Sequence, residues 1–236
     1  MIRFLLSSCC CLLLISCDRA ATQQPAAAAA ESRGDALVRA VHLIPYAAAM
    51  DIFAGDLVVF DAVAFKSVTR YRALDGKRYA FAVRPAGMTN AKPLSQNTEG
   101  LEDGHSYTVF AMPDAERGTR LRVVEDALRR PSSGKSRLRI VHAGDGLGIV
   151  DVHADNDTLF DGLAFQTVTD YQDVPALNGK IDIRHTGGST SAIALSNAHL
   201  EAGRFYTLVI VGSTQSGAPA EAFIIEDALD ASATTR

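Results

Sequence analysis

The polar side chains best suited to chemistry gather in one short stretch of the second half of the chain. Asp151, His153, Asp155 and Asp157 stand at alternating positions there. Oxygen ligands clustered in one loop can hold a calcium ion. The stretch also has the composition of an ordinary hairpin turn, and it lacks the glycine and the closing glutamate of an EF-hand loop. We therefore expect no metal and no cofactor in the protein, and these four residues are the only candidates for a metal site.

Two histidines, His42 and His142, occupy matching places in the two halves of the chain, each at the end of an apolar stretch. A neutral imidazole can serve as a metal ligand or as a general base. A catalytic histidine needs a nucleophile beside it, and the sequence offers no partner for either residue. We interpret both as structural histidines that form a hydrogen bond to a nearby carbonyl or carboxylate in the core.

Adjacent carboxylates recur at Glu125-Asp126 and Glu226-Asp227. Neighbouring residues of a strand point to opposite faces of its sheet, so neither pair can flank one substrate as the acids of a glycosidase do. One carboxylate of each pair is better placed to offset an arginine of the first strand, Arg39 or Arg139, across the sheet. The sequence indicates no catalytic residues, and we expect the protein not to be an enzyme.

These residues recur because the chain contains an internal duplication at an offset of about one hundred residues. The matched segments keep one order: Arg39–His42 with Arg139–His142, Phe60–Thr69 with Phe160–Thr169, Leu101–Thr108 with Leu200–Thr207, and Glu125–Leu128 with Glu226–Leu229. A unit of about ninety residues is a normal size for a domain. We expect two domains that each fold alone, over 36–130 and 137–230, with a polar linker at 131–136 and a disordered tail at 231–236.

Apolar and polar residues alternate with a period of two inside each unit, as in Ala80–Arg84 and Lys180–Arg184. This period is typical of strands with one buried face, and turn sequences such as Asp75-Gly76 and Asn178-Gly179 separate the alternating runs. About seven short strands per unit are the pattern of a sandwich. The sequence predicts an all-β fold of two tandem immunoglobulin-like (fibronectin-type-like) antiparallel β-sandwich domains.

One tyrosine in each unit follows a turn in the same context, Tyr107 within Leu101–Thr108 and Tyr206 within Leu200–Thr207. The pattern resembles the tyrosine corner of immunoglobulin-like sandwiches, in which the ring packs in the core and the hydroxyl bonds to the backbone a few residues upstream. The alternative is a strand that simply begins with an aromatic residue after a turn. We interpret both tyrosines as structural.

The first residues have the layout of a secretion signal. Arg3 precedes an apolar run, Phe4–Ile15, that is too short to span a bilayer but suits the apolar part of a signal peptide. The run ends in Leu14-Ile15-Ser16-Cys17, which resembles the lipobox of bacterial lipoproteins. That resemblance implies cleavage of a signal at residues 1–16 and acylation of Cys17. The alternative is an ordinary signal peptide that is cleaved nearby without lipid.

The segment after the signal, residues 17–35, holds almost no large apolar side chains, so we expect a disordered tether. All four cysteines lie at or before position 17, so the two domains must be held together by core packing alone. We expect a lipid-anchored protein of the cell envelope, on the periplasmic side of the inner membrane or on the outer membrane.

With these features in order, each unit resembles a family known as domain of unknown function 4397. The matching features of the second unit are Val141-His142, then Val150-Asp151-Val152, then Gly162-Leu163-Ala164-Phe165, and Leu200–Thr207 with its Gly and Tyr-Thr. The first unit has Ala62-Val63-Ala64-Phe65 in place of the third feature. The resemblance implies this fold and an envelope setting, and it brings no established activity and no catalytic residues.

The formal net charge is −4, and no patch rich in lysine and arginine stands out, so we expect no nucleic-acid partner. The leading hypothesis is a non-catalytic binding or structural module that presents two β-sandwiches to an envelope protein or a glycan. The alternative is an envelope hydrolase or a calcium-binding protein that uses the Asp and His cluster of the second unit. A deep polar pocket with converging His and Asp favours the alternative, whereas exposed aromatics such as Tyr46 and Phe53 favour binding.

Overall fold

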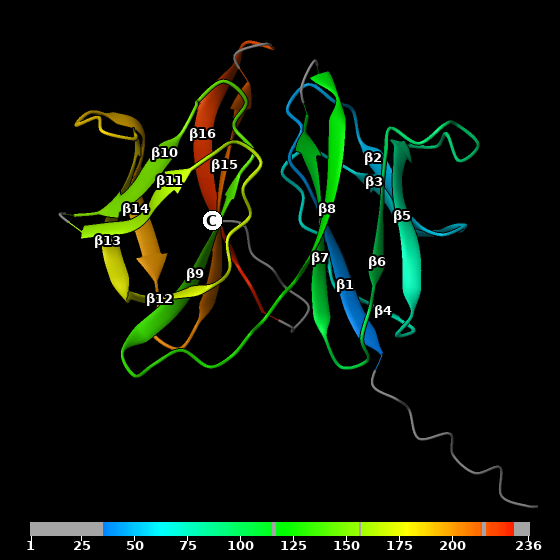
Figure 1. Ribbon diagram of the computed structural model, residues 1–236, viewed down its shortest axis with the longest axis horizontal. Coiled ribbons are helices and arrows are strands. Elements are labelled where there is room, and N and C mark those ends of the chain that lie inside the picture. Colours follow the sequence, from blue (N-terminus) through cyan, green and yellow to red (C-terminus); the bar gives the residue numbers. More distant parts are fainter. Residues whose placement is uncertain (1–34, 115–116, 156, 214–215, 229–236) are drawn as a thin grey trace, which may run out of the picture. The chain divides into compact units, whose positions relative to one another are not determined.

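The computed structural model describes residues 35–114, 117–155, 157–213 and 216–228, and within them the protein is built from β-strands without an α-helix (Figure 1). The first repeat contributes β1 (Ala36–His42), β2 (Met50–Ala54), β3 (Leu57–Val63), β4 (Arg72–Leu74), β5 (Arg78–Pro85), β6 (Ser95–Gly100), β7 (Ser106–Pro113) and β8 (Thr119–Glu125). The second repeat contributes β9 (Lys135–His142), β10 (Val150–Ala154), β11 (Asp157–Leu163), β12 (Gln172–Pro175), β13 (Leu177–His185), β14 (Ser191–Leu200), β15 (Phe205–Ser213) and β16 (Ala218–Glu226). No helix in this part of the chain is long and apolar enough to cross a bilayer.

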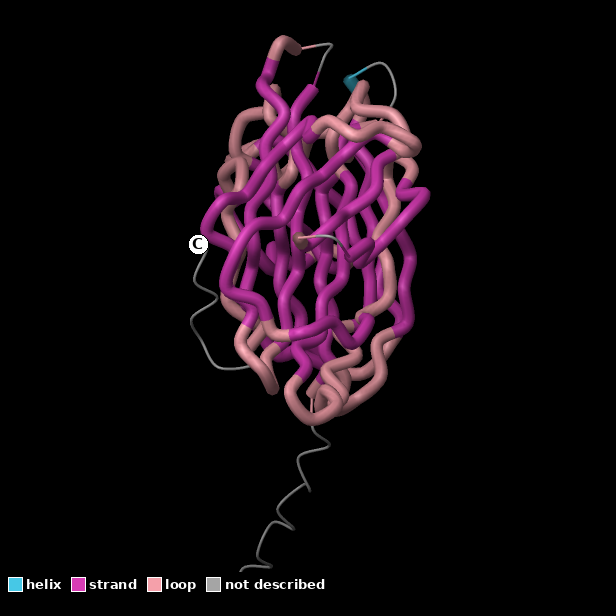
Figure 2. Tube along the Cα trace, turned by 90° about the vertical axis from the view of Figure 1, so that its left-hand side faces the viewer, coloured by secondary structure: helices cyan, strands magenta, loops and turns pink. Residues whose placement is uncertain are grey.

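Each repeat folds its strands into two four-stranded sheets. In the first repeat the orders are β4-β1-β7-β8 and β3-β2-β5-β6, and the second repeat has β12-β9-β15-β16 and β11-β10-β13-β14. Figure 2 shows the strands in magenta, with the loops gathered towards their two ends. The prediction of an all-β fold with tandem β-sandwiches is confirmed.

The core of each sandwich lies between its two sheets, where the alternating apolar side chains meet. Val38 and Val109 from one sheet of the first repeat pack with Ile52 and Phe81 from the other. The second repeat has a separate core of the same kind. Period-two alternation in the sequence produces this arrangement because every second side chain of a strand faces the opposite sheet.

The strand pairing differs in two respects from the expected antiparallel sandwich of about seven strands. Each repeat has eight strands in the described residues, and its central strands run parallel, β1 beside β7 and β9 beside β15. The additional strand in the first repeat is the short β4, which is too brief to show alternation in the sequence. The parallel pairing arises because the chain passes through both sheets before β7 returns beside β1, and side-chain alternation carries no information on strand direction.

A third apolar cluster joins the two repeats. In β1, Val38 and Ala40 face the core of the first repeat, whereas Val41 belongs to a cluster with residues of the second repeat. We call this set the inter-repeat cluster, and its buried members are Val41, Leu43, Phe110, Met112, Val141, Ala143, Val209, Val211, Phe223 and Ile225. The sheets β4-β1-β7-β8 and β12-β9-β15-β16 therefore pack against each other, and the described residues belong to one compact unit.

Candidate functional site

The structure places Asp151 in a structural position on β10. Its Oδ1 accepts hydrogen bonds from the Thr186 hydroxyl at 2.7 Å and from the backbone N–H of Gly162 at 2.8 Å. The Thr186 hydroxyl and then the Gly162 amide hold the pKa of Asp151 below its usual value. In the first repeat, Asp51 likewise accepts a hydrogen bond from the backbone N–H of Ala62. Ala62 and Gly162 both have left-handed backbone, with φ of 48° and 62°, so each aspartate stabilises a bulged strand edge.

The other three metal candidates lie along the β10–β11 hairpin. His153 faces Thr158 of β11, and its Nδ1 lies 3.1 Å from the Thr158 hydroxyl. Asp155 occupies the turn with φ of 51°, and Asp157 begins β11 with its side chain exposed. In the described residues, no three His, Cys, Asp or Glu side chains come together in a group able to hold a metal ion. The stretch serves as a hairpin turn in this structure.

His42 and His142 are buried at matching strand ends, but their hydrogen bonding differs. The Nε2 of His142 lies 2.9 Å from the carbonyl oxygen of Gly148, and its Nδ1 accepts a hydrogen bond from the backbone N–H of Gly144 at 3.2 Å. In the described residues, neither ring nitrogen of His42 has a hydrogen-bond partner of normal geometry, and the Ala48 backbone near the ring makes at most a poorly aligned contact. Burial lowers the pKa of both histidines, so both imidazoles are held neutral.

The two corner tyrosines have equivalent surroundings. The rings of Tyr107 and Tyr206 are only 6% and 4% exposed and pack in the cores of their own repeats. The hydroxyl oxygen of Tyr107 accepts a hydrogen bond from the backbone N–H of Glu102 at 3.0 Å. That of Tyr206 accepts one from Glu201 at the same distance. Each hydroxyl therefore ties the start of a central strand to the turn that precedes it.

The most deeply buried charges lie between the repeats. We call Arg39, Arg139, Asp126 and Asp227 the buried ion cluster, and each is at most 4% exposed. The pairs cross from one repeat to the other: Arg139 Nη2 lies 2.6 Å from Asp126 Oδ1, and Arg39 binds Asp227 in the same way. Each carboxylate, Asp126 after β8 and Asp227 after β16, thus pairs most closely with the arginine of the other repeat. The sequence predicts the partner arginine on the same sheet as the carboxylate.

Hydroxyl groups complete the buried ion cluster. Thr108 donates to Asp126 at 2.7 Å and Thr207 donates to Asp227 at 2.6 Å. Burial alone would raise the pKa of Asp126, but the guanidinium groups of Arg139 and Arg39 hold it below its usual value. One nitrogen of each arginine, Nη1, has no hydrogen-bond partner in the described residues. We expect the paired charges to hold the two sheets in one register.

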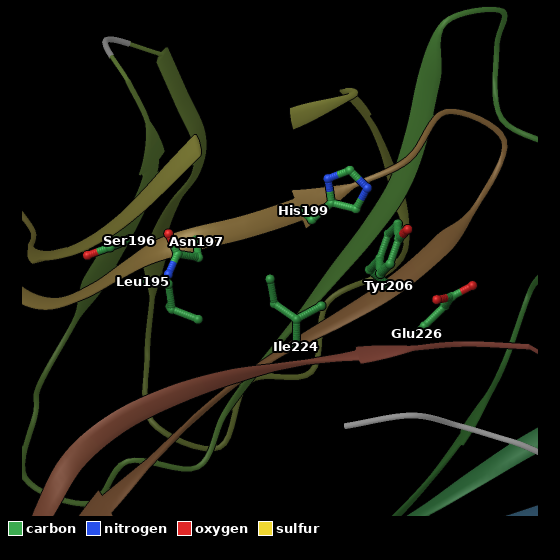
Figure 3. Close-up of a pocket in the computed structure, with 7 residues that line it drawn as sticks. All are labelled: Leu195, Ser196, Asn197, His199, Tyr206, Ile224 and Glu226. Atoms are coloured by element: carbon green, nitrogen blue, oxygen red, sulfur yellow. The ribbon is translucent and has the colours of Figure 1, made fainter. Parts of the chain in front are cut away.

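The accessible site of the second repeat is a groove between the edge strands β14 and β16. Seven residues line this β14–β16 groove: Leu195, Ser196, Asn197, His199, Tyr206, Ile224 and Glu226. Its volume is about 180 Å³. Figure 3 shows Leu195 and Ile224 between the two strands, with Tyr206 and Glu226 towards one end. The groove offers an apolar floor with polar groups at its rim.

The same place in the first repeat is closed by side chains. The Ser95 hydroxyl oxygen accepts a hydrogen bond from the backbone N–H of Leu121, at 3.1 Å. The amide of Asn97 donates to the Leu121 carbonyl oxygen, at 3.4 Å. These two bonds join β6 to β8 across the gap between the sheets. The edge of the first sandwich is consequently bridged by polar side chains.

The strand register identifies the residues of the second repeat that replace this bridge. Ser95 pairs with Val83 and Asn97 with Phe81, whereas Ile193 and Leu195 pair with the equivalent residues of β13. Aliphatic side chains therefore stand where the first repeat has its two bridging residues. Sequence reasoning missed this difference because the offset between the repeats changes within the hairpin: Ser95 lies twelve positions after Val83, whereas Ile193 lies ten after Ile183. A bulge in the β13–β14 pairing then shifts the offset again.

The polar residues of the groove do not converge as a catalytic set. Ser196 points away from the other labelled side chains in Figure 3. His199 Nε2 lies 3.1 Å from a carboxylate oxygen of Glu201, outside the groove lining, and Glu226 binds Arg204 at 3.4 Å. These side chains are engaged with neighbouring surface residues at the rim.

The two aromatics considered for a binding surface are engaged elsewhere. Phe53 is 3% exposed, and the guanidinium carbon of Arg84 lies 4.2 Å from its ring centre. Tyr46 is half-buried against the core of the first repeat, and its hydroxyl donates a hydrogen bond to the Gly118 carbonyl oxygen at 3.1 Å. Neither ring is therefore the flat exposed aromatic that would favour binding, because the loop and strand that carry them fold onto the first sandwich.

Comparison with known proteins finds one family. The model described as "Domain of unknown function (DUF4397)" matches residues 36–153 and, in an overlapping region, residues 146–236. No curated protein matches the chain. The family model thus matches the chain twice in tandem, although the first match extends through β9 into β10 and the second begins after β9.

Proposed function

Because the chain belongs to the DUF4397 family and carries two copies of its domain, one of which leaves an apolar groove open, we propose that it is a non-catalytic binding protein of the cell envelope. The β14–β16 groove is the binding site, and a protein is the partner. The observation that carries this proposal is the exchange of the Ser95 and Asn97 bridge for aliphatic residues at one site of the duplicated fold.

A binding role accounts for the polar residues better than catalysis does. His42 and His142 sit neutral in the interior, and the buried ion cluster joins the two repeats. Asp151 stabilises a strand bulge. The side chains with the chemistry of an enzyme site are therefore committed to the fold, which supports a site that recognises a partner by shape and apolar contact.

A protein partner suits the groove better than a glycan. Sugar rings are commonly held against flat aromatic faces, but the tyrosine of the groove lining, Tyr206, is only 4% exposed. Leu195 and Ile224 instead present branched aliphatic groups. Such a floor matches an apolar side chain of a polypeptide. Holding both sandwiches as one compact unit keeps the groove in a fixed shape, and this reduces the entropy lost on binding.

We propose that the protein is held at the membrane through acylated Cys17, on the periplasmic side of the inner membrane or on the outer membrane. Cys17 and the signal at 1–16 lie outside the described residues, as do all but the last residue of the tether and the tail at 231–236. Cys17→Ser should release the protein from the membrane fraction or leave its precursor uncleaved. A variant that is processed normally and stays as firmly bound as the wild type would show that the anchor is not this cysteine.

Site-specific photo-crosslinking in living cells tests the groove. A photoreactive residue at Asn197, on the groove rim, should yield a discrete crosslinked protein. The matched control is the exposed Thr98 of β6, at the bridged edge of the first repeat, and it should yield none. Equal products at both positions, or none at Asn197, would rule out the groove as the site of a protein partner.

A further inference from the structure

We propose that the partner contributes an extended peptide segment that pairs as an added strand with the outer edge of β16 and inserts an apolar side chain between Leu195 and Ile224. This inference rests on the proposed function and specifies how the same groove recognises its partner. Strand addition is an established mode of peptide recognition in which main-chain hydrogen bonds supply affinity and side-chain pockets supply specificity.

The main chain of the first repeat shows which groups need a partner. Leu121 pairs with Ala111 of β7, and both its N–H and its C=O point away from β7 to meet Ser95 and Asn97. Ala222 holds the same register position in the second repeat, opposite Ile210 of β15. Its N–H and C=O therefore point to the outer edge of β16. No backbone hydrogen bond between β14 and β16 is found among the described residues.

The residues that could have satisfied those groups are aliphatic. Ile193 and Leu195 stand where the first repeat has a hydroxyl and an amide, so neither can bond to the Ala222 backbone. In an antiparallel pair the outward groups recur at every second residue, so Ile224 presents its N–H and C=O along the same edge. An extended peptide carries one donor and one acceptor at each residue, in the spacing that this edge requires.

The floor of the groove fits the side chains of such a strand. Successive side chains of a strand point to opposite sides, so every second one faces the gap between Leu195 and Ile224. Charges and proline usually protect an exposed edge, and β16 carries Pro219, Glu221 and Glu226. The stretch 222–225 between them has neither, so the added strand pairs there. An acyl chain would fill the apolar floor but leave the Ala222 amide and carbonyl without partners.

The test uses a random decapeptide library displayed on phage, selected on the mature chain from residue 18. We expect enriched sequences in which apolar residues alternate. Leu195→Asn, which restores the residue type of the first repeat at a half-buried position, should weaken binding by about tenfold or more with an unchanged circular dichroism spectrum. N-methylation of the peptide amides that face β16 should also abolish binding, and bound peptide should slow hydrogen exchange at the Ala222 amide.

A reciprocal variant keeps the proposal testable if Leu195→Asn is unstable. Ser95→Ile combined with Asn97→Leu removes the bridge from the first repeat, at two half-buried positions, and should create a second site and raise the peptide stoichiometry from one to two. No enrichment, or binding that is indifferent to Leu195→Asn and to N-methylation, overturns strand addition. Light scattering that shows a dimer abolished by Leu195→Asn would identify the occupant as a second copy and also overturn it. If peptides fail while Asn197 still crosslinks to a protein in cells, strand addition is wrong and the proposed function stands.

Discussion

Asp126→Asn is the most informative perturbation of this fold, because it removes one charge from the buried ion cluster with little change in shape. The Asp126 and Arg139 side chains are both 0% exposed, and their closest oxygen and nitrogen atoms are 2.6 Å apart. Asparagine can still accept the hydrogen bonds of Thr108 and Tyr71, which both donate to Asp126 in the wild type. The asparagine NH2 then takes the place of Oδ1 and faces the Arg139 guanidinium, which is also a donor. The change therefore removes the negative charge beside two arginines together with the hydrogen bond from Arg139.

The expected cost follows from burial. Opposite unit charges about 4 Å apart attract by about 4 kcal/mol at an effective dielectric constant of about 20. Breaking a buried pair by removing one partner typically costs about 3–5 kcal/mol, because the other charge stays buried without compensation. We expect Asp126→Asn to lower the free energy of unfolding by about 3 kcal/mol, the lower end of that range, since its hydrogen bonds survive in part. Single domains have only about 5–15 kcal/mol to lose.

Urea unfolding of the mature chain, followed by circular dichroism, measures this loss in a double-mutant cycle with Arg139→Met. The double variant again has equal numbers of buried positive and negative charges, so its loss should be smaller than the sum of the two single losses by about 1–3 kcal/mol. Additive losses, or a loss below about 1 kcal/mol for Asp126→Asn, would show that the cluster does not hold the repeats together.

Acid unfolding offers an independent check on the same residue. The pKa of Asp126 is held below its usual value in the folded protein. Its contribution to stability is therefore fully present above its unfolded pKa of about 3.9, and it is lost as the pH falls through the folded value. Asp126→Asn should flatten the decline in stability below about pH 4, and an unchanged slope there would contradict this account of the pair.

The remaining predictions concern the tyrosines and the histidines. Tyr107→Phe and Tyr206→Phe should each cost about 0.5–1.5 kcal/mol in urea unfolding through loss of the hydroxyl bond, and no loss at either would exclude a corner. His142→Leu should cost about 1–3 kcal/mol because two backbone groups lose their partner, whereas His42→Leu, with no such bond to lose, should cost less; the reverse order would refute the assignment. The pKa of His142 is lowered, so its burial costs stability as the pH falls below about 6.5, and His142→Leu should flatten the stability curve below that pH.

The amino-acid sequence determined the parts of this structure that depend on local pattern. Alternation in segments such as Lys180–Arg184 specifies a strand with one face inward, and the structure has β13 there. The duplicated segments fold into sandwiches with the same strand order in both copies. The hydrogen bonds of Tyr107 and Tyr206 to the preceding turn were likewise predictable, because a turn followed by tyrosine is a contiguous sequence pattern.

Other features depend on residues that only the folded chain brings together. The sequence shows that Arg39 and Val41 share one face of a strand, but not that this face packs on the equivalent face of the second repeat. The crossed pairing of Asp126 and Asp227 is equally hidden, because a charge finds its partner through space and not through chain spacing.

The β14–β16 groove illustrates the limit most clearly. In the sequence, Ile193 and Leu195 look like ordinary strand residues. Only the strand register shows that they occupy the positions that Ser95 and Asn97 hold in the first repeat. Hydrophobic pattern determined which side chains are buried within each sandwich, since burial follows from alternation on a single strand. The tertiary structure decided which surfaces meet and which edge stays open, since both depend on how separate strands pair and on the bulge that shifts their register.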